Sequence, residues 1–298
     1  MRSPSNIVLF GASSDIGQLL HTKLQRAGLD VRKVSRRLPS CFKADLETRE
    51  GLDEAVRDAG TVISCAHPRY TDAILKACRP KTRLVLMGSA WRFSHVPNSA
   101  ADQVRVAERL FLANSNPGIM LHSTMIYGGN QETNIQRLLS VLQRFPILPL
   151  PGGGQKIVRP IYIDDLVECI FRAASKVWET PTAIAVAGPA LTWRDMAAAC
   201  AQAKGWRRLF VTVPNAPAIT LLEFLRTIGI ETPSPDILRR FNESPEFSTE
   251  EMNSLLGVVP RPFEAGIRMA IQGWENRDRG ELFNRFSGPL EIAETKNL

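Results

Sequence analysis

Apolar positions along the first 190 residues alternate between two spacings. Short β-branched runs have the length of buried strands, and the stretches between them carry apolar residues every three to four positions, as on one helix face. The predicted strands are residues 6–10, 31–35, 61–66, 83–88, 118–122, 156–163 and 182–187. The predicted helices are residues 16–28, 70–78, 100–113, 134–145 and 164–174, with another starting near residue 48. This alternation indicates an α/β fold, a Rossmann-type doubly wound parallel sheet covered by helices.

The pattern changes after Gly188 and Pro189, where helical pieces are separated by prolines. These pieces predict a smaller, mostly helical C-terminal lobe. We therefore expect two domains, residues 1–188 and residues 189–298, with the loop at 129–155 reaching from the first toward the second.

A tight turn follows the first predicted strand and opens an amphipathic helix. In dinucleotide-binding proteins a first glycine, here Gly11, makes this turn, and a last one, here Gly17, lets helix and strand pack closely. Amides at the helix start then hold the diphosphate. Ser14 replaces the middle glycine, and its hydroxyl could donate a hydrogen bond to the diphosphate. An ordinary strand–helix turn is the alternative. The expected cofactor contacts here are Gly11, Ser13, Ser14, Asp15, Ile16 and Gly17.

The end of the second predicted strand bears on the choice of cofactor. NAD-selective proteins place Asp or Glu there, to bind the ribose 2′-hydroxyl. This chain has Ser35, Arg36 and Arg37 instead. Because a guanidinium binds a phosphate through two parallel hydrogen bonds, the two arginines favour NADP. NAD remains open, and solvated surface arginines are the alternative interpretation.

Composition limits the other possibilities. The 298 residues carry a net charge of +7, but lysines and arginines form no run of five, so nucleic-acid binding is not expected. The five cysteines and four histidines show no metal-ligand spacing, so we expect no metal and reduced thiols in a cytoplasmic protein. No segment has the length and apolarity of a membrane span. The expected partner is a small-molecule substrate, with a homodimer left open.

Several segments together resemble the extended and atypical short-chain dehydrogenases/reductases, the NAD(P)-dependent epimerase/dehydratase family. The likeness spans about residues 7–205 and fades beyond them. It is carried by residues 11–17, 44–46, 62–66, 84–89, 124–128, 161–166 and 187–192. The resemblance implies a Rossmann fold that binds a nicotinamide dinucleotide.

The resemblance also implies roles for single residues. Asp45 and Leu46 correspond to an Asp-Leu pair that packs on adenine. Cys65 and Ala66 end a strand that lies against the cofactor. Ser89 ends the next strand, at a position where a serine polarises the substrate oxygen.

The tyrosine and lysine on which the family's chemistry depends are missing. None of the three tyrosines has a lysine four residues later. The helix that should carry the pair, aligned by Glu108, has Ala100 and Val104 at the two positions. A register shifted by one residue gives Ala101 and Arg105, and an arginine stays protonated at neutral pH. The usual proton-transfer mechanism is therefore absent.

Substitute groups near the nicotinamide end are Ser89, His95 and Tyr127 as catalytic candidates, with Arg159 as a substrate contact. A surface location for His95 and a lining role for Tyr127 are the alternatives. His122 and Arg105 are further groups at this end, and a satisfied core histidine is the simpler interpretation of His122.

Two functions fit these observations. One is an NADP-dependent oxidoreductase or epimerase with a non-standard proton donor and an unassigned small-molecule substrate. The other is a module that holds NADPH for structure or sensing without turnover. The NADPH-binding accessory subunit of respiratory complex I is a family member of the second kind, and its overall pattern is similar.

Overall fold

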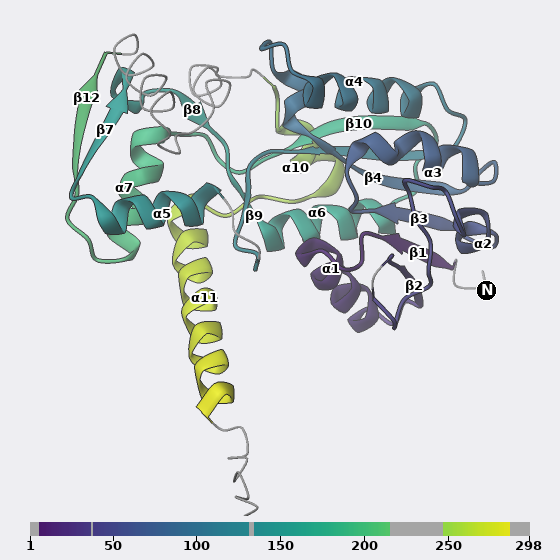
Figure 1. Ribbon diagram of the computed structural model, residues 1–298. Helices are drawn as coiled ribbons and strands as arrows, with labels where there is room; N and C mark the ends of the chain where they lie inside the picture. The colour runs from purple at the N-terminus through teal and green to yellow at the C-terminus, as the bar shows by residue number, and fades with distance from the viewer. Residues whose placement is uncertain (1–5, 37, 131–133, 215–246, 287–298) are drawn as a thin grey trace, which may run out of the picture.

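The computed structural model describes residues 6–36, 38–130, 134–214 and 247–286. These residues form a large lobe around a parallel sheet and a smaller lobe beside it (Figure 1). None of the helices in the described ranges is both long enough and apolar enough to cross a bilayer. The described residues also contain no cluster of side chains suited to hold a metal ion.

The central sheet has six strands in the order β10-β5-β4-β3-β1-β2. All neighbours in it run parallel. The strands are β1 (Ile7–Phe10), β2 (Val31–Val34), β3 (Thr61–Ser64), β4 (Arg83–Ser89), β5 (Gly118–Ser123) and β10 (Pro181–Val186). The order reverses at β1, because β2 lies on one side of it and β3 on the other. In doubly wound sheets, ligands bind outside the carboxyl ends of the strands at this reversal.

Helices cover both faces of the sheet because side chains alternate along each strand. Leu9 packs in one core with α1 (Asp15–Arg26) and α6 (Ile163–Ser175). Val8 and Phe10 pack in the opposite core. The helices of that second core are α2 (Leu52–Val56), α3 (Thr71–Ala77) and α4 (Ser99–Leu112). The predicted doubly wound α/β fold is therefore confirmed.

The small lobe is built around a third core. Its helices are α5 (Asn134–Arg144), α7 (Trp193–Ala203) and the first part of α11 (Phe263–Phe286), which then extends away from the body (Figure 1). A parallel pair of strands, β7 (Ile147–Pro151) and β12 (Leu209–Val213), completes it. In its described part the lobe is thus mostly helical, as predicted, with one pair of strands added.

Short elements join the lobes and shape their boundary. They are β6 (Ile126–Tyr127) paired with β9 (Ile161–Tyr162), β8 (Ile157–Val158) paired with β11 (Leu191–Thr192), and the 3₁₀ helices η1 (Pro68–Tyr70), η2 (Ala90–Phe93) and η3 (Gly152–Gly154). The single strand predicted at residues 156–163 is wrong, because the chain forms β8 and β9 with different partners there. The helix predicted near residue 48 begins at Leu52, after a left-handed Gly51.

The single domain boundary predicted at residue 188 is too simple. α5 and β7 precede it but belong to the small lobe. After it, α10 (Glu250–Leu256) returns to the large lobe, where Met252 and Leu256 are buried against the sheet. Asp165 on α6 accepts hydrogen bonds from the Arg261 backbone N–H at 3.0 Å and from its guanidinium Nε at 2.9 Å. This buried carboxylate holds the segment that leads back to the small lobe.

Candidate functional site

The turn between β1 and α1 has the geometry that a dinucleotide site requires. Gly11 has a φ of +73°, in the left-handed region that favours glycine, and a Cβ there would lie 2.9 Å from the Cys65 carbonyl carbon. A Cβ on Gly17 would overlap the carbonyl oxygen of Gly11 and lie 2.8 Å from the Ala12 Cα. A side chain at position 11 would therefore collide with the backbone after β3, and one at position 17 would displace α1 from β1.

Ser14 caps α1 from within this turn. Its Oγ accepts a hydrogen bond from the Gly17 N–H at 3.1 Å and donates one to the Gly11 carbonyl at 2.8 Å. In this arrangement the hydroxyl hydrogen points to the protein, so donation to a diphosphate would require it to rotate. The first-turn amides of α1 lie at the positive end of the helix dipole. They are the groups suited to hold an anion here.

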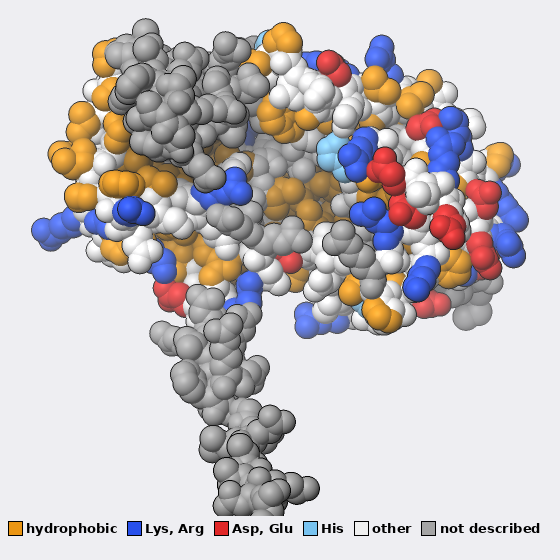
Figure 2. Space-filling model, in the orientation of Figure 1, with side chains coloured by type: hydrophobic (Ala, Val, Ile, Leu, Met, Phe, Trp, Pro, Cys, Tyr) orange, Lys and Arg blue, Asp and Glu red, His pale blue; other side chains and the backbone are white. Residues whose placement is uncertain are grey.

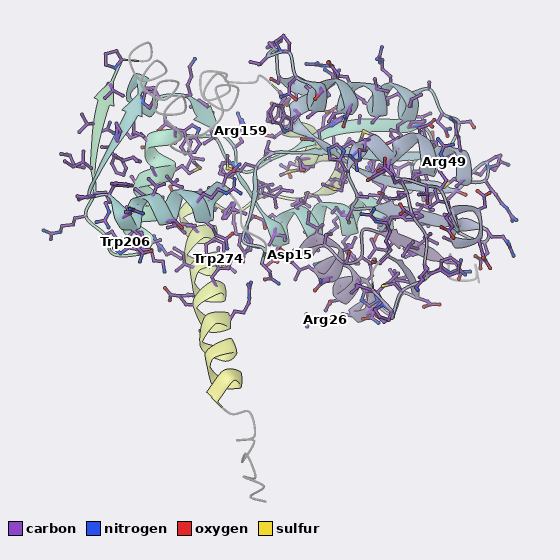
Figure 3. The ribbon with its side chains drawn as sticks, viewed as in Figure 1. Asp15, Arg26, Arg49, Arg159, Trp206 and Trp274 are labelled. Atoms are coloured by element: carbon purple, nitrogen blue, oxygen red, sulfur yellow. The ribbon has the colours of Figure 1, made fainter. Side chains whose placement is uncertain are left out.

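Asp15 links the turn to the small lobe. Its Oδ2 accepts a hydrogen bond from the Asn130 N–H at 2.5 Å. The adjacent Gly129 carbonyl accepts one from Nε1 of Trp274 on α11 at 2.7 Å. The labelled Asp15 and Trp274 mark the two ends of this connection (Figure 3). The carboxylate is thus held toward the loop at residues 129–130.

The predicted adenosine contacts gather at the end of β2. Arg36 and Asp45 form an ion pair at 3.7 Å between the guanidinium Nη1 and Oδ2, and the Arg36 side chain is 53% exposed. Asp45 also accepts a hydrogen bond from the Glu47 N–H at 2.7 Å. Leu46 packs against the core beneath. Arg37, the second predicted phosphate contact, lies outside the described residues. The structure therefore brings together residues predicted for the 2′-phosphate and for adenine.

A cleft of about 360 Å³ opens beside the turn, at the carboxyl ends of β3 and β4. Its lining residues are Ile16, Cys65, Ala66, His67, Pro68, Met87, Gly88, Ser89, Trp91, Ala100, Val104, Ser123 and Ile126. Hydrophobic side chains are visible in the hollow between the two lobes (Figure 2). The predicted residues Ile16, Cys65, Ala66 and Ser89 thus line one cleft at the point where the strand order reverses.

The two positions expected for the missing tyrosine and lysine both face this cleft. Ala100 and Val104 line it from α4. The shifted register is wrong, because Ala101 is fully buried and Arg105 donates hydrogen bonds to Asp102 and to the Ser94 carbonyl. At the two positions predicted for the pair, the helix therefore presents apolar side chains to the cleft.

A buried set of polar groups lies behind the cleft. His122, only 1% exposed, accepts a hydrogen bond from the Ser89 N–H at its Nδ1, so its neutral form carries the proton on Nε2. Nε2 lies 3.4 Å from Oε1 of Glu108, too poorly aligned for a full hydrogen bond and without another partner in the described residues. The second oxygen of Glu108 accepts from Nε of Arg92 at 2.6 Å. His122 is thus a core histidine that holds the end of β4.

The charge on Glu108 is stabilised by these neighbours. Burial raises the pKa of the Glu108 carboxyl, but its interactions with His122 and Arg92 outweigh burial and leave the pKa below its usual value. The carboxylate therefore stays ionised beside the cleft at neutral pH.

The remaining catalytic candidates lie away from the cleft lining. His95 is exposed in the segment after η2 and does not line the cleft. Tyr127 is 1% exposed, packs against Tyr162 and Phe263, and turns its hydroxyl toward Gly266. Burial raises the pKa of the Tyr127 phenol. Neither His95 nor Tyr127 therefore lines the cleft in this structure.

The predicted substrate contact Arg159 lies at the boundary between the lobes (Figure 3). Its guanidinium stands 5.9 Å from the ring centroid of Phe247, which in turn stacks on Phe93 at 4.9 Å. Phe93 belongs to η2, next to the cleft residue Trp91. The Arg159 guanidinium therefore stands over the Phe247 ring near the cleft, without being part of its lining.

His67 is the cleft residue that the sequence interpretation missed. It lines the cleft, and its Nδ1 accepts a hydrogen bond from the Arg69 N–H at 3.2 Å, capping η1. Burial and, to a lesser degree, the nearby Arg69 charge lower the pKa of the His67 imidazole. Burial also raises the pKa of the Cys65 thiol to about 12. His67 is thus a titratable lining residue whose lowered pKa favours the neutral form of its ring at pH 7.

Comparisons with known proteins show the fold. No protein-family model matches the sequence. A search of curated proteins likewise finds no match. Among solved structures, MoeE5 in complex with UDP-glucose and NAD is 19% identical, with a TM-score of 0.68, and the alignment covers 92% of this chain and 99% of that one.

Two further solved structures are similar in fold. UDP-glucuronic acid 4-epimerase from Bacillus cereus, in complex with UDP-glucuronic acid and NAD, is 14% identical, with a TM-score of 0.68 and coverage of 91% and 99%. dTDP-4-dehydrorhamnose reductase from Bacillus anthracis, in complex with NADP, is 14% identical, with a TM-score of 0.67 and coverage of 91% and 100%. The predicted resemblance to NAD(P)-dependent epimerases, dehydratases and reductases is thus confirmed at the level of the fold.

Proposed function

We propose that this chain binds NADP through the turn between Gly11 and Gly17 and acts as an oxidoreductase or epimerase-like protein on a small molecule. The observation that carries the proposal is the close approach of α1 to β1 at Gly17, which aims the helix start into the cleft. A bound nicotinamide nucleotide would supply or accept hydride there. The proposal is supported by structural neighbours that are titled as complexes with NAD or NADP.

NADP rather than NAD is proposed because of the charge at the end of β2. Arg36 is exposed and paired only loosely with Asp45, at 3.7 Å. A 2′-phosphate offers the guanidinium two strong acceptor oxygens, which an NAD ribose does not. The free hydroxyl of NAD would leave this arginine with its weak pairing to Asp45.

A second candidate function is binding without turnover. It is favoured by one observation, the apolar Ala100 and Val104 at the two positions from which a tyrosine and a lysine would act. In this case NADPH would be retained for structure or sensing. The cofactor site is common to both functions, so the two functions differ only in whether a substrate reacts inside the cleft.

One experiment tests the proposal and separates the two functions. The purified chain is titrated with NADPH and with NADH, and nucleotide fluorescence is recorded. We expect NADPH to bind at least about tenfold more tightly, the effect of one charge-assisted contact. A panel of aldehydes and ketones is then tested for oxidation of the bound NADPH. Turnover supports the enzyme, and tight binding without turnover supports the retaining module. Equal affinity for the two nucleotides would contradict the assignment of Arg36.

A further inference from the structure

The cleft contains a hydrogen-bond donor that stands outside the sequence pattern of the family. We propose that His67, in its neutral form, donates a hydrogen bond from Nε2 to the carbonyl oxygen of an apolar aldehyde or ketone bound beside Ser89. The inference rests on the proposed function, because it requires a nicotinamide cofactor in the same cleft. It assigns to the loop after β3 the role of hydrogen-bond donor to the substrate, for which α4 has no suitable side chain.

The orientation of the imidazole ring follows from its hydrogen bond. Nδ1 accepts from the Arg69 N–H at 3.2 Å, so it has no proton, and the neutral ring carries its hydrogen on Nε2. The same bond fixes the ring as the cap of η1. Nε2 is the ring nitrogen left for a ligand in the cleft. A neutral imidazole held in this way can polarise a carbonyl without giving up its proton.

Cys65 and Ser89 also place polar side chains in the cleft lining, as candidate donors to the substrate oxygen. The Cys65 thiol has a pKa of about 12 and stays protonated. Ser89 Oγ accepts a hydrogen bond from the Trp91 N–H at 3.3 Å, which leaves its own hydrogen for a second partner. His67 and Ser89 both line the cleft and each keeps a hydrogen to donate, so we assign both to the substrate oxygen, as in an oxyanion hole.

The position of η1 supports this assignment. η1 packs against both α4 and β4, the elements that carry Ala100, Val104 and Ser89. Alanine and valine are much smaller than tyrosine and lysine, and neither can donate a hydrogen bond from its side chain. His67, directly before η1, lines the same cleft as these two residues.

The walls of the cleft define the chemical class of the substrate. The lining of the cleft is more apolar than polar, and it includes Met87, Trp91, Val104 and Ile126. A sugar would leave most of its hydroxyls unpaired against these side chains, at a cost for each buried group. An aromatic or aliphatic carbonyl compound buries its body there and directs its single oxygen to the donors.

The chemical step balances without an enzymic acid. A bound reduced nicotinamide would supply hydride to the carbonyl carbon, and the π electron pair of the C=O bond would move onto oxygen. The resulting alkoxide would accept hydrogen bonds from His67 and Ser89 and would take a proton from water. The products would be an alcohol, oxidised nicotinamide and hydroxide, with His67 keeping its proton throughout.

A first test needs no cofactor. Two-bond ¹H–¹⁵N NMR spectra of the full-length chain at pH 7.5 report which ring nitrogen of each histidine is protonated, and the H67Q spectrum identifies the His67 signals. We expect the neutral Nε2–H form. A proton on Nδ1, or a charged ring, would overturn the proposal.

A second test uses 4-nitrobenzaldehyde as the apolar carbonyl and D-glyceraldehyde as a polar control. We expect the wild-type chain to oxidise NADPH with 4-nitrobenzaldehyde and to use D-glyceraldehyde poorly. In H67A, kcat should fall about 100-fold, the effect of removing one such donor. H67Q should recover most of this loss, because the glutamine amide also donates. H21A, a histidine substitution outside the cleft lining, should leave kcat unchanged.

NADPH titration of the same variants distinguishes the proposed cofactor binding from the proposed role of His67. H67A should bind NADPH with wild-type affinity. Absence of NADPH binding by the wild-type chain would refute the proposed function itself. Wild-type NADPH binding without turnover of 4-nitrobenzaldehyde, or equal kcat in H67A and wild type, would refute the role of His67 and leave the cofactor assignment standing.

Discussion

Gly17 on α1 lies so close to Gly11 at the end of β1 that a single methyl group between them would overlap the Gly11 carbonyl oxygen. The contact is backbone against backbone, so no side chain can move to relieve it. It sets the distance between strand and helix, and therefore the position of the amides at the helix start. A ligand that depends on those amides depends on this contact.

Gly17→Ala should therefore abolish nucleotide binding. The added Cβ forces α1 away from β1 and removes the amides from the diphosphate. We expect the Kd for NADPH, measured by fluorescence titration, to rise at least about 100-fold, equivalent to two or more lost charge-assisted hydrogen bonds.

Gly273→Ala is the matched control for this substitution. It lies in helix α11, and a Cβ there meets no atom within 4 Å. Alanine in a helix interior should even stabilise the chain slightly. Unchanged NADPH binding by Gly17→Ala, in a variant whose circular dichroism is normal, would contradict the role given to the turn.

Arg36→Ala should weaken NADPH binding and leave NADH binding nearly unchanged. The guanidinium is expected to contact the phosphate that distinguishes the two nucleotides. Loss of one charge-assisted contact corresponds to a rise in Kd of about tenfold to a hundredfold. Arg26→Ala removes an exposed arginine of the same lobe and controls for net charge. A parallel weakening of both nucleotides in Arg36→Ala would show that the arginine contacts another part of the cofactor.

Glu108→Gln should make the stability of the chain less sensitive to acid. The pKa of Glu108 is lowered in the folded state from its ordinary value of 4.5, so its ionised form stabilises the fold above that value. This contribution is lost as the pH falls from 4.5 through the lower folded-state pKa. At pH 7 we expect the variant to be less stable by about 2 kcal/mol, because Arg92 and His122 lose a partly buried charged partner.

Urea unfolding of both proteins between pH 3 and pH 7 measures this effect. The difference in free energy of unfolding between wild type and variant should shrink as the pH falls below 4.5. A difference that stays constant over this range would show that Glu108 contributes through packing alone.

Much of the large lobe could be predicted because its determinants are local. Buried β-branched runs mark each strand of the sheet, and the glycine spacing from Gly11 to Gly17 marks the turn. The position of Ala100 and Val104 was also predictable, since a helix repeats regularly from Glu108. In each case residues close in sequence determine the local structure.

Features that depend on long-range packing were missed. Tyr127 lies on the two-residue strand β6, too short for a periodic pattern to show which way its ring points. α10 returns to the large lobe through contacts with a sheet far away in sequence. The place of His67 in the cleft depends on the packing of η1 against α4. Its one sequence signal was its place directly after Cys65 and Ala66, which were themselves predicted to contact the cofactor.

The most direct measurement of the central claim is a crystal structure of the chain grown with NADP. The account predicts the diphosphate at the start of α1, within hydrogen-bonding distance of its first-turn amides and between Gly11 and Gly17. A nucleotide bound elsewhere, or a turn that stays free of nucleotide at saturating NADP, would contradict it.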